Sequence, residues 1–342
     1  MKSIREAGAR ERSKARRDLD PYSYVSCWTE DEVMDNQECK ALVLILATKG
    51  CSWALRSGCS MCGYTNESSS SATDESLWQQ YLSGMKNFAA QRVLKIYTSG
   101  SFLDTFEISL DLRKRILQDA FDNFDMIVVE TRHEYINRKN LEDILPYREK
   151  LVLAVGVESS NDLVVHYSVN KPSLFTHFIS ASSLAHSMGF RVKSYMMFKP
   201  PFMSESDAIR DAVNTIRDLS QYSDVISINP TNIQRDTVVE LLWKSGAFRP
   251  PWLWSLVEVI RSSNISGPRL MSKPTGAGTV RGAHNCGRCD ERVLKAISSY
   301  SVRQSLDVFE DIDCSCRKTW ERELMISRFG NYFTESNYRI RE

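Results

Sequence analysis

Three of the chain's nine cysteines lie within one short segment, TKGCSWALRSGCSMCGYTN, at positions 48–66. Seven residues separate Cys51 from Cys59, and two separate Cys59 from Cys62. Three thiolates on one loop can ligate three irons of a cubane iron–sulfur cluster and leave the fourth iron open to bind and activate a small molecule. A zinc loop is the alternative, because Cys59 and Cys62 alone fit zinc as well, although zinc normally takes four ligands and no fourth Cys or His lies nearby.

Four further cysteines form a second group of two close pairs. Two residues separate Cys286 from Cys289, and one separates Cys314 from Cys316. Two such pairs about 25 residues apart are typical of a structural zinc site, in which His284 could replace one ligand; a second iron–sulfur cluster is the alternative. Basic residues near this group could hold nucleic-acid phosphates, namely Arg281, Arg288, Arg292 and Lys295.

Composition is that of an ordinary globular protein. The 342 residues are 42% hydrophobic and 25% charged, with a formal net charge of +1, and this excludes intrinsic disorder across most of the chain. The strongest apolar run, residues 41–47, is too short to cross a membrane, and the basic N-terminus lacks the apolar segment of a signal peptide. We therefore expect a cytoplasmic protein whose clustered cysteines bind metal rather than form disulfides.

Charge is unevenly distributed along the chain. Residues 1–17 carry seven Lys or Arg against two Glu, and residues 261–295 carry seven against two acidic residues. Two basic stretches in a near-neutral protein suit a polyanion bound at particular places, although a solvated tail and a solvated loop would show the same charge.

The elements that must position these residues follow a repeating pattern. Six short apolar runs lie at 41–47, 92–98, 126–131, 150–157, 191–198 and 224–230. They alternate with five segments of helical character near 74–91, 107–123, 137–147, 173–188 and 204–222. This alternation predicts buried parallel strands joined by helices. We expect an α/β fold with a partial (β/α)6 TIM-like barrel, with a doubly wound sheet as the alternative, and ligands at the carboxyl ends of the strands.

The alternation ends near residue 230, where the prolines and tryptophans of RPPWLW interrupt it. We therefore divide the chain into a basic N-terminal arm (1–40), the barrel (41–235) and a small C-terminal extension (236–342). The extension contains the second cysteine group, expected to bind metal, and a basic loop.

Longer motifs carry a resemblance to a known family. A three-cysteine loop after the first strand of a βα-repeat domain resembles the radical S-adenosylmethionine (SAM) superfamily, although the usual first gap there is three residues. YTSGSFLD (97–104), VVETRHEYI (128–136), VGVESSNDLV (155–164) and VKSYMMFKPPFMSESDAIRD (192–211) resemble the branch that contains the Elongator catalytic subunit. ISINPTNIQRDTVVELLW (226–243) and RPPWLWSLVEVI (249–260) are most similar to the radical SAM subunits of archaeosine synthase. The resemblance covers roughly residues 20–320.

The resemblance implies a set of cofactor contacts. Cys51, Cys59 and Cys62 would hold a [4Fe–4S] cluster, and SAM would chelate the open iron through its amino and carboxylate groups. Met61 stands where the superfamily often has an aromatic residue against adenine, and Gly100 permits a close approach in the Ser99–Ser101 turn.

Charged residues at the strand ends complete the expected SAM site. Glu158 would accept from the ribose hydroxyls, and Arg132 or Lys193 would pair with the SAM carboxylate. Glu130 and Lys199 are further candidates, although buried ion pairs would also explain such charges. Four polar residues could line the substrate cavity or serve in packing and capping: Tyr195, Asn229, Asn232 and Gln234.

The same resemblance implies a lyase acting on a tRNA D-loop 7-deazaguanine that carries a lysine joined through its side-chain nitrogen. A deoxyadenosyl radical from SAM would remove a hydrogen beside that nitrogen, and cleavage of the C–N bond would leave archaeosine. The implied partners are tRNA, the lysine-transferring subunit of archaeosine synthase and an electron donor. Two other functions remain open: a different radical SAM modification of a tRNA base, such as methylthiolation or acid-group addition, and a non-enzymatic RNA adaptor with zinc at both cysteine groups.

Overall fold

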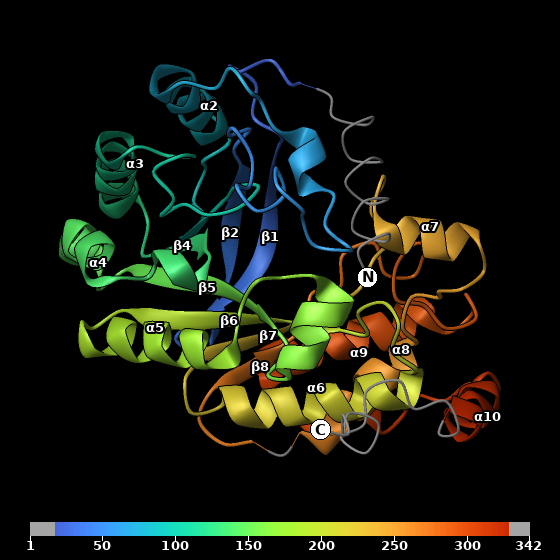
Figure 1. The fold of residues 1–342 in the computed structure, drawn as a ribbon. Coiled ribbons are helices and arrows are strands. Elements are labelled where there is room, and N and C mark those ends of the chain that lie inside the picture. Colours follow the sequence, from blue (N-terminus) through green and yellow to red (C-terminus); the bar gives the residue numbers. More distant parts are fainter. Residues whose placement is uncertain (1–17, 264, 328–342) are drawn as a thin grey trace.

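The computed structural model describes residues 18–263 and 265–327, which form a single mixed sheet with helices around it (Figure 1). The strands are β1 (Ser26–Met34), β2 (Gln37–Ile45), β3 (Val93–Tyr97), β4 (Met126–Thr131), β5 (Leu151–Glu158), β6 (Arg191–Phe198), β7 (Val225–Pro230) and β8 (Arg269–Met271). They lie in sequential order from β1 to β8; β2 to β8 are parallel and β1 is antiparallel to β2. In a doubly wound sheet the spatial order of the strands would reverse near the middle. The sequential order observed here confirms the partial barrel.

Helices connect the parallel strands and cover the outer face of the sheet, where Figure 1 shows them following one another around it. They are α2 (Asp74–Met85), α3 (Leu110–Asn123), α4 (Arg138–Ile144), α5 (Phe175–Ser187) and α6 (Glu205–Leu219). The side chains of Thr73 and Ser204 accept hydrogen bonds from the first turns of α2 and α6 and cap these helices. Gly189, with φ +84°, follows the end of α5.

The two faces of each strand have different surroundings. On β3, Leu94 and Ile96 belong to the large core between sheet and helices, whereas Val93 belongs to a smaller cluster on the other face. Lys95 and Tyr97, on the same face as Val93, line a cavity. The concave face of the half-barrel is therefore partly polar.

The sheet extends beyond the six strands that the sequence predicts. β1 lies within the segment expected to be a basic arm, and β8 lies in a stretch expected to be an irregular loop. β1 contains SCWTEDEVM, whose inward-facing Glu30 and Glu32 are paired with Lys95. The sequence did not predict this strand because its inward-facing positions are acidic rather than apolar. A carboxylate can be buried there only with a basic partner, and that partner is distant in the sequence. Residues 1–17, the most basic part of the expected arm, lie outside the described residues.

Side chains connect the two edges of the half-barrel. Lys273, just after β8, forms ion pairs with Glu30 (3.1 Å) and Glu32 (3.5 Å) of β1. Arg269 of β8 donates a 2.5 Å hydrogen bond to Asn36 in the turn between β1 and β2. Ion pairs and hydrogen bonds thus connect β1 with β8 across the open side of the barrel.

The C-terminal part packs against the barrel rather than forming a separate lobe. Its helices are α7 (Val238–Lys244), α8 (Leu253–Ser262), α9 (Asp290–Arg303) and α10 (Arg317–Ser327). α8 lies on α6, and buried residues of α8 and α9 join the same core cluster as the strands. Among the described residues, no helix combines the length and the apolar character needed to span a bilayer.

Candidate active site

A cavity of about 480 Å³ opens at the carboxyl ends of the parallel strands. The loop after β2 brings Cys51, Cys59 and Cys62 to its wall. Most other residues expected to contact SAM also line it, namely Met61, Ser99, Gly100, Glu130, Arg132, Glu158 and Lys193. Tyr195, Asn229, Asn232 and Gln234 line it as well. The structure therefore brings together residues from five different strands, or the turns after them, and the three-cysteine loop.

Tight packing fixes the first cysteine against the turn after β3. A methyl group added at Gly100 would lie 2.8 Å from Cα and 2.9 Å from Cβ of Cys51, and 2.3 Å from Oε1 of Glu107. Glu107 accepts hydrogen bonds from Thr48 Oγ1 (2.6 Å) and the backbone N–H of Ser101 (2.7 Å), and burial raises its pKa to about 7. Glu107, which the sequence analysis did not select, thus joins the start of the cysteine loop to the β3 turn.

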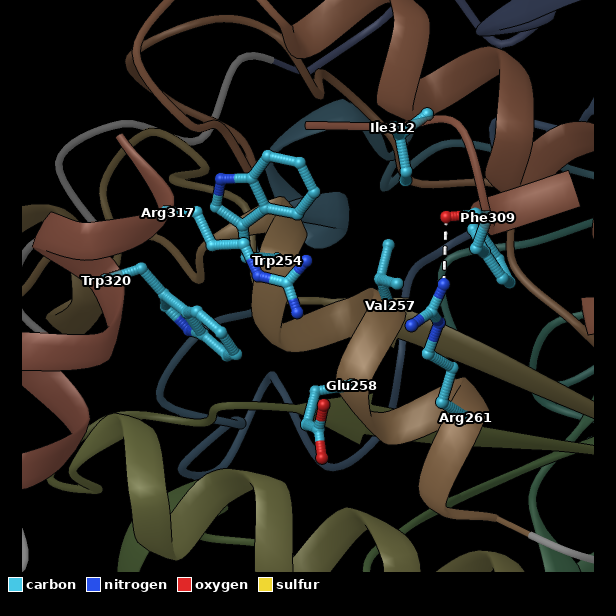
Figure 2. Close-up of a pocket in the computed structure, with 8 residues that line it drawn as sticks. All are labelled: Trp254, Val257, Glu258, Arg261, Phe309, Ile312, Arg317 and Trp320. Atoms are coloured by element: carbon cyan, nitrogen blue, oxygen red, sulfur yellow. Dashed lines mark hydrogen bonds between the residues drawn. The ribbon is translucent and has the colours of Figure 1, made fainter. Parts of the chain in front are cut away.

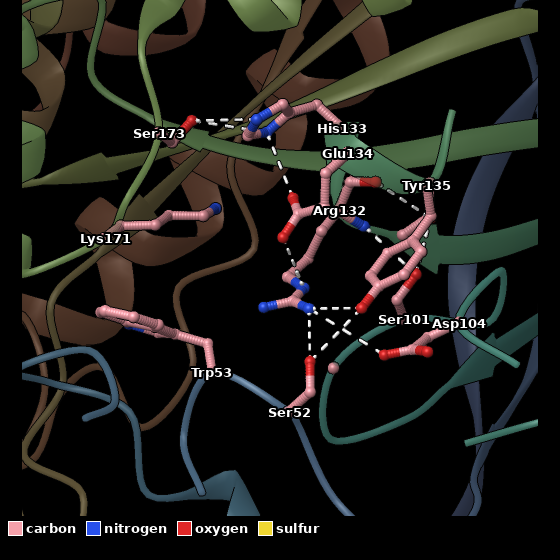
Figure 3. A network of polar contacts seen from close by, with 12 residues as sticks. Ser52, Trp53, Ser101, Asp104, Arg132, His133, Glu134, Tyr135, Lys171 and Ser173 are labelled. Atoms are coloured by element: carbon pink, nitrogen blue, oxygen red, sulfur yellow. Dashed lines mark hydrogen bonds and ion pairs between the residues drawn. The ribbon is translucent and has the colours of Figure 1, made fainter. Parts of the chain in front are cut away.

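Arg132 is the cation beside the cysteine loop (Figure 3). Its guanidinium donates to Ser52 Oγ (2.7 Å) and Tyr135 Oη (2.8 Å) and pairs with Glu134 (3.3 Å). Ser52 follows Cys51 directly, so this network fixes the loop and leaves a mostly buried positive charge facing the cavity. Of the two cations expected for a SAM carboxylate, Arg132 is the one in direct contact with the cysteine loop.

A second ion pair lies on the opposite side of that loop. Glu158, at the end of β5, adopts φ +71° and pairs with Lys171 Nζ at 3.0 Å. Lys171 also donates to the carbonyl of Gly156 at 2.6 Å. The neighbouring Trp53 donates from its indole N–H to the carbonyl of Asn170 at 2.9 Å. A left-handed backbone at a glutamate is costly, and its presence here is typical of a functional site.

Two expected cofactor residues lie outside the cavity wall. Ser101 is fully buried behind the β3 turn, where its hydroxyl lies 2.7 Å from Thr131 Oγ1. Lys199 forms a 2.5 Å ion pair with Glu205 and donates to the carbonyl of Arg249. Its backbone turns away after β6 with φ +56°, and the side chain forms the buried structural ion pair that was the alternative interpretation.

The wall of the cavity includes residues that the sequence analysis did not select for the site. Lys171 reaches it because the chain returns after a π-helix (Val164–Val169), and Lys95 and Lys273 reach it from β3 and from beyond β8. His133 is buried, stacks on His177 and also faces the cavity. No local motif marks the three lysines, whereas His133 lies within VVETRHEYI (128–136).

The donor set at the cavity fits a three-coordinated iron–sulfur cluster. Three thiols on one loop face a space large enough for a cofactor, and two cations border that loop. Iron favours such a soft thiolate set. The same cavity offers hydroxyl, carboxylate and basic groups of the kinds that SAM would require.

The second cysteine group is compact. The sulfur atoms of Cys286, Cys289, Cys314 and Cys316 all lie within 4.8 Å of one another. Trp254 donates to Cys316 Sγ (3.2 Å) and Asn285 to Cys289 Sγ (3.4 Å). His284 instead contacts the carbonyl of Gly282 and is not part of the group. Four thiols at such distances match tetrahedral metal ligation.

A small pocket beside this group has no room for a substrate. It measures about 10 Å³, no more than one water molecule requires, and lies between α8 and α10 (Figure 2). Trp254 and Trp320 form part of its wall, and Arg261 donates to the carbonyl of Phe309 at 2.8 Å. This pocket is a packing feature of the extension.

The basic residues near the second cysteine group differ in whether their charges are already paired within the protein. Arg281 pairs with Glu240 (2.7 Å) and donates to the carbonyl of Ile233, so its charge is compensated. Arg288 and Arg292 are exposed. Arg288 contacts Ser315 (3.5 Å) and the thiol of Cys286, and Arg292 donates to the carbonyl of Asp313 (3.2 Å). Lys295 is exposed and pairs with Glu291 on the same helix.

Gly100→Ala is expected to loosen the cysteine loop. The added methyl group overlaps backbone atoms of Cys51, which cannot rotate away, so we expect a loss of about 1–3 kcal/mol in unfolding free energy. The amount of iron bound per chain after anaerobic reconstitution should also fall. Gly246→Ala is the control for iron binding: its methyl group would meet no atom within 4 Å, so it should keep its iron, while its φ of +74° costs about 1 kcal/mol of stability by itself. Full iron binding and unchanged stability in Gly100→Ala would contradict the packing described here.

A half-barrel of sequential parallel strands, with a three-cysteine loop at its carboxyl rim, defines a radical SAM protein. The chain is 36% identical to archaeosine synthase subunit beta of Methanosarcina acetivorans, covering 88% of this chain and 90% of that protein. It is also 36% identical to the Thermococcus kodakarensis subunit beta, with 86% and 94% covered. The chain therefore belongs to the family of archaeosine synthase beta subunits, in the branch that also contains the Elongator catalytic subunit.

More distant similarities cover less of the molecules. Mouse Elongator complex protein 3 is 28% identical over 39% of this chain and 24% of its own length. Among solved structures, Methanocaldococcus infernus Elp3 with an N-terminal deletion has a TM-score of 0.47 and 17% identity, with 67% of this chain and 58% of that chain covered. No family model matches the chain.

Proposed function

We propose that the protein is a radical SAM lyase of tRNA modification. In this reaction the lysine C–N bond of a lysine-bearing 7-deazaguanine is cleaved and archaeosine remains on the tRNA. The observation that carries the proposal is the meeting of three cysteines with the polar strand ends in one cavity. The names of the two relatives that match nearly the whole chain support archaeosine as the product.

Cys51, Cys59 and Cys62 would hold a [4Fe–4S] cluster, and the cavity would bind SAM beside it. When bound, the cluster and SAM supply a deoxyadenosyl radical, which can remove a hydrogen that no acid or base could take. Arg132 would pair with the SAM carboxylate, and Glu158, held by Lys171, would accept from the ribose hydroxyls. Met61 lines the cavity and would contact the adenine by dispersion.

The chain's own contribution is to position the substrate and exclude water. The lysine arm must enter a cavity bordered by Tyr97, Tyr195 and Asn229, and the base must leave its stack to reach it. Tyr64 and Trp28 are exposed aromatic residues that also line the cavity and could contact a base there. The product would be tRNA bearing the amidine.

The partners follow from the same proposal. The word "beta" in the names of the relatives supports a second, lysine-transferring subunit that would supply the substrate. An external electron donor would reduce the cluster. The second cysteine group would hold a structural zinc ion, with the thiol distances as support.

Anaerobic incubation with SAM, reductant and lysine-bearing tRNA tests the reaction. Mass analysis of the nucleosides should show archaeosine appearing as the lysine-bearing base disappears, with deoxyadenosine formed alongside. An inert lysine-bearing tRNA together with active SAM cleavage would favour a different radical SAM modification. A colourless protein that contains only zinc would favour the RNA adaptor.

Reversal of two exposed charges should weaken tRNA binding. Arg288→Glu with Arg292→Glu is expected to lower tRNA affinity about tenfold at low salt and to reduce the salt-dependence slope by about 2, because two phosphate contacts are lost. Arg138→Glu with Lys139→Glu, on α4, makes the same change of net charge and is the control. Filter binding at several salt concentrations measures both effects. If both double variants bound tRNA with equal affinity, Arg288 and Arg292 would not be part of the tRNA-binding surface.

A further inference from the structure

The wall of the cavity formed by β1, β3 and β6 holds a charge cluster that the proposed cofactor contacts do not use. Lys95, on β3, is 1% exposed and forms ion pairs with Glu30 (2.5 Å) and with Glu32 of β1. Lys273 pairs with the same two carboxylates. Lys193, on β6, lies close enough to influence all four groups. Three ammonium groups therefore face the two carboxylates of β1, and Glu130 is a third carboxyl beside Lys193.

Lys193 is the cation whose charge is not compensated by direct contact. Its side chain is 6% exposed and lines the cavity, and its Nζ lies 5.5 Å from the ring centroid of Tyr195. Within residues 18–263 and 265–327, no carboxylate forms an ion pair with it. Burial, with Lys95 nearby, lowers the pKa of Lys193 to about 8. A buried ammonium in this state gains stability from an incoming anion.

Glu130, near Lys193, is a carboxyl group that has no ion-pair partner among the residues that the structure describes. It lies near the end of β4 and lines the cavity, and across the described part of the chain its side chain has neither a hydrogen bond nor an ion pair. Burial raises its pKa to about 8, and Lys193 is the largest opposing influence on that pKa. The two groups are thus neighbours, yet they do not form an ion pair. The hydroxyls of Tyr97 and Tyr195, 3.2 Å apart, face the same space.

Lys193 lies within β6 rather than at its carboxyl end. It is the third residue of β6 and five residues before the carboxyl end of that strand at Phe198. The sheet register places Ala154 of β5 between Lys193 and Glu130 of β4, so these two residues lie in the same row of the sheet. Arg132, by contrast, contacts Ser52 within the loop. A carboxylate bound at the loop therefore has Arg132 beside it, and Lys193 is free for a different anion.

We propose that the part of the cavity between Lys193 and Glu130 binds the α-amino and α-carboxylate groups at the free end of the lysine arm, with Lys193 pairing with the carboxylate and Glu130 accepting from the ammonium. This subsite rests on the proposed function, because it assumes a lysine joined through its side-chain nitrogen. Such an arm enters with its reacting end towards the rim, and its four methylene groups carry the zwitterionic end inward. A zwitterion supplies a carboxylate for direct contact with Lys193 and an ammonium for Glu130, whose raised pKa that ammonium would lower.

Three chemically defined tRNAs test the subsite. One carries lysine, one carries 1,5-diaminopentane, which lacks the carboxylate, and one carries 6-aminohexanoate, which lacks the α-amino group. Affinities for the SAM-loaded, unreduced protein should fall about 10- to 100-fold for each analogue, because each loses a charge-assisted contact in a buried site. Lys193→Met should lose this preference for lysine over diaminopentane, and Glu130→Gln should lose that for lysine over aminohexanoate. Lys40→Met removes an exposed charge outside the cavity and should keep both preferences.

The outcomes separate the subsite from the reaction. If the wild-type protein converts lysine-bearing tRNA but Lys193→Met and Glu130→Gln keep the full preferences, the subsite assignment is overturned while the function stands. A loss of SAM affinity in Lys193→Met, measured without tRNA, would assign Lys193 to the cofactor and also overturn it. If the wild-type protein under reducing conditions leaves lysine-bearing tRNA unchanged, the proposed function fails first. Either variant alone decides the question if the other does not fold.

Discussion

Cys59→Ala is expected to abolish deoxyadenosine formation while the protein remains folded. Cys59 lies on the loop after β2 and lines the cavity with Cys51 and Cys62. Removal of one of three thiolates leaves a cluster with two protein ligands, which should be lost during purification. We expect iron at this site to fall from about four atoms per chain to near zero and SAM cleavage to fall at least 1,000-fold. Iron analysis and chromatography of the reaction products measure both quantities.

Cys27→Ala is the matched control for this prediction. Cys27, on β1, is a free, half-buried thiol outside the cavity, and its sulfur lies 3.8 Å from the carbonyl of Gly84. This variant should keep its iron and its SAM cleavage. If Cys59→Ala still cleaved SAM at the wild-type rate, Cys59 would not be a ligand of the reactive centre.

Cys289→Ala should first affect stability rather than chemistry. Cys289 is 1% exposed, and its sulfur contacts those of Cys286 (4.0 Å) and Cys316 (3.7 Å) beneath α8 and α9. A metal present at 1,000 times its dissociation constant stabilises the folded state by about 4 kcal/mol. Loss of one ligand should remove most of this contribution and lower the midpoint of thermal unfolding by several degrees.

Chelation provides the corresponding experiment on the wild-type chain. Prolonged treatment with a strong chelator should destabilise the wild-type protein to about the level of Cys289→Ala, and the variant itself should respond little. Cys39→Ala, which removes a thiol of β2 outside the group, should behave as wild type in this respect. Equal stability of Cys289→Ala and wild type, with metal absent from both, would contradict a structural role for the four cysteines.

The sequence predicted the fold well where a strand's burial depends on its own residues. β4 (Met126–Thr131) and β6 (Arg191–Phe198) have the predicted bounds, because their apolar side chains pack in the core. β1 was missed because its inward carboxylates are compensated by Lys95 and Lys273, the latter more than 200 residues away. Such a pair cannot be inferred from a local pattern, and a three-residue strand such as β8 is too short to show any periodicity.

In the candidate site, too, the residues whose positions follow from the local sequence were predicted, and those whose positions depend on distant parts of the chain were not. Residues directly at strand ends, such as Glu130 and Arg132, reach the cavity as parallel topology requires. Lys199 also follows a strand, but its left-handed backbone directs it to Glu205 instead. Lys171 reaches the cavity through a π-helix and a left-handed Asn170, a path that local sequence does not reveal.

Magnetic resonance on oxygen-free protein tests the account most directly, because every proposed function of the cavity requires one iron without a protein ligand. The protein would be reduced in the presence of SAM labelled with ¹⁵N at its amino group and ¹⁷O at its carboxylate. We predict hyperfine coupling of both labels to a [4Fe–4S] cluster, and its disappearance in Cys59→Ala. A cluster that shows no coupling to either label, or a loop without iron, would contradict the account.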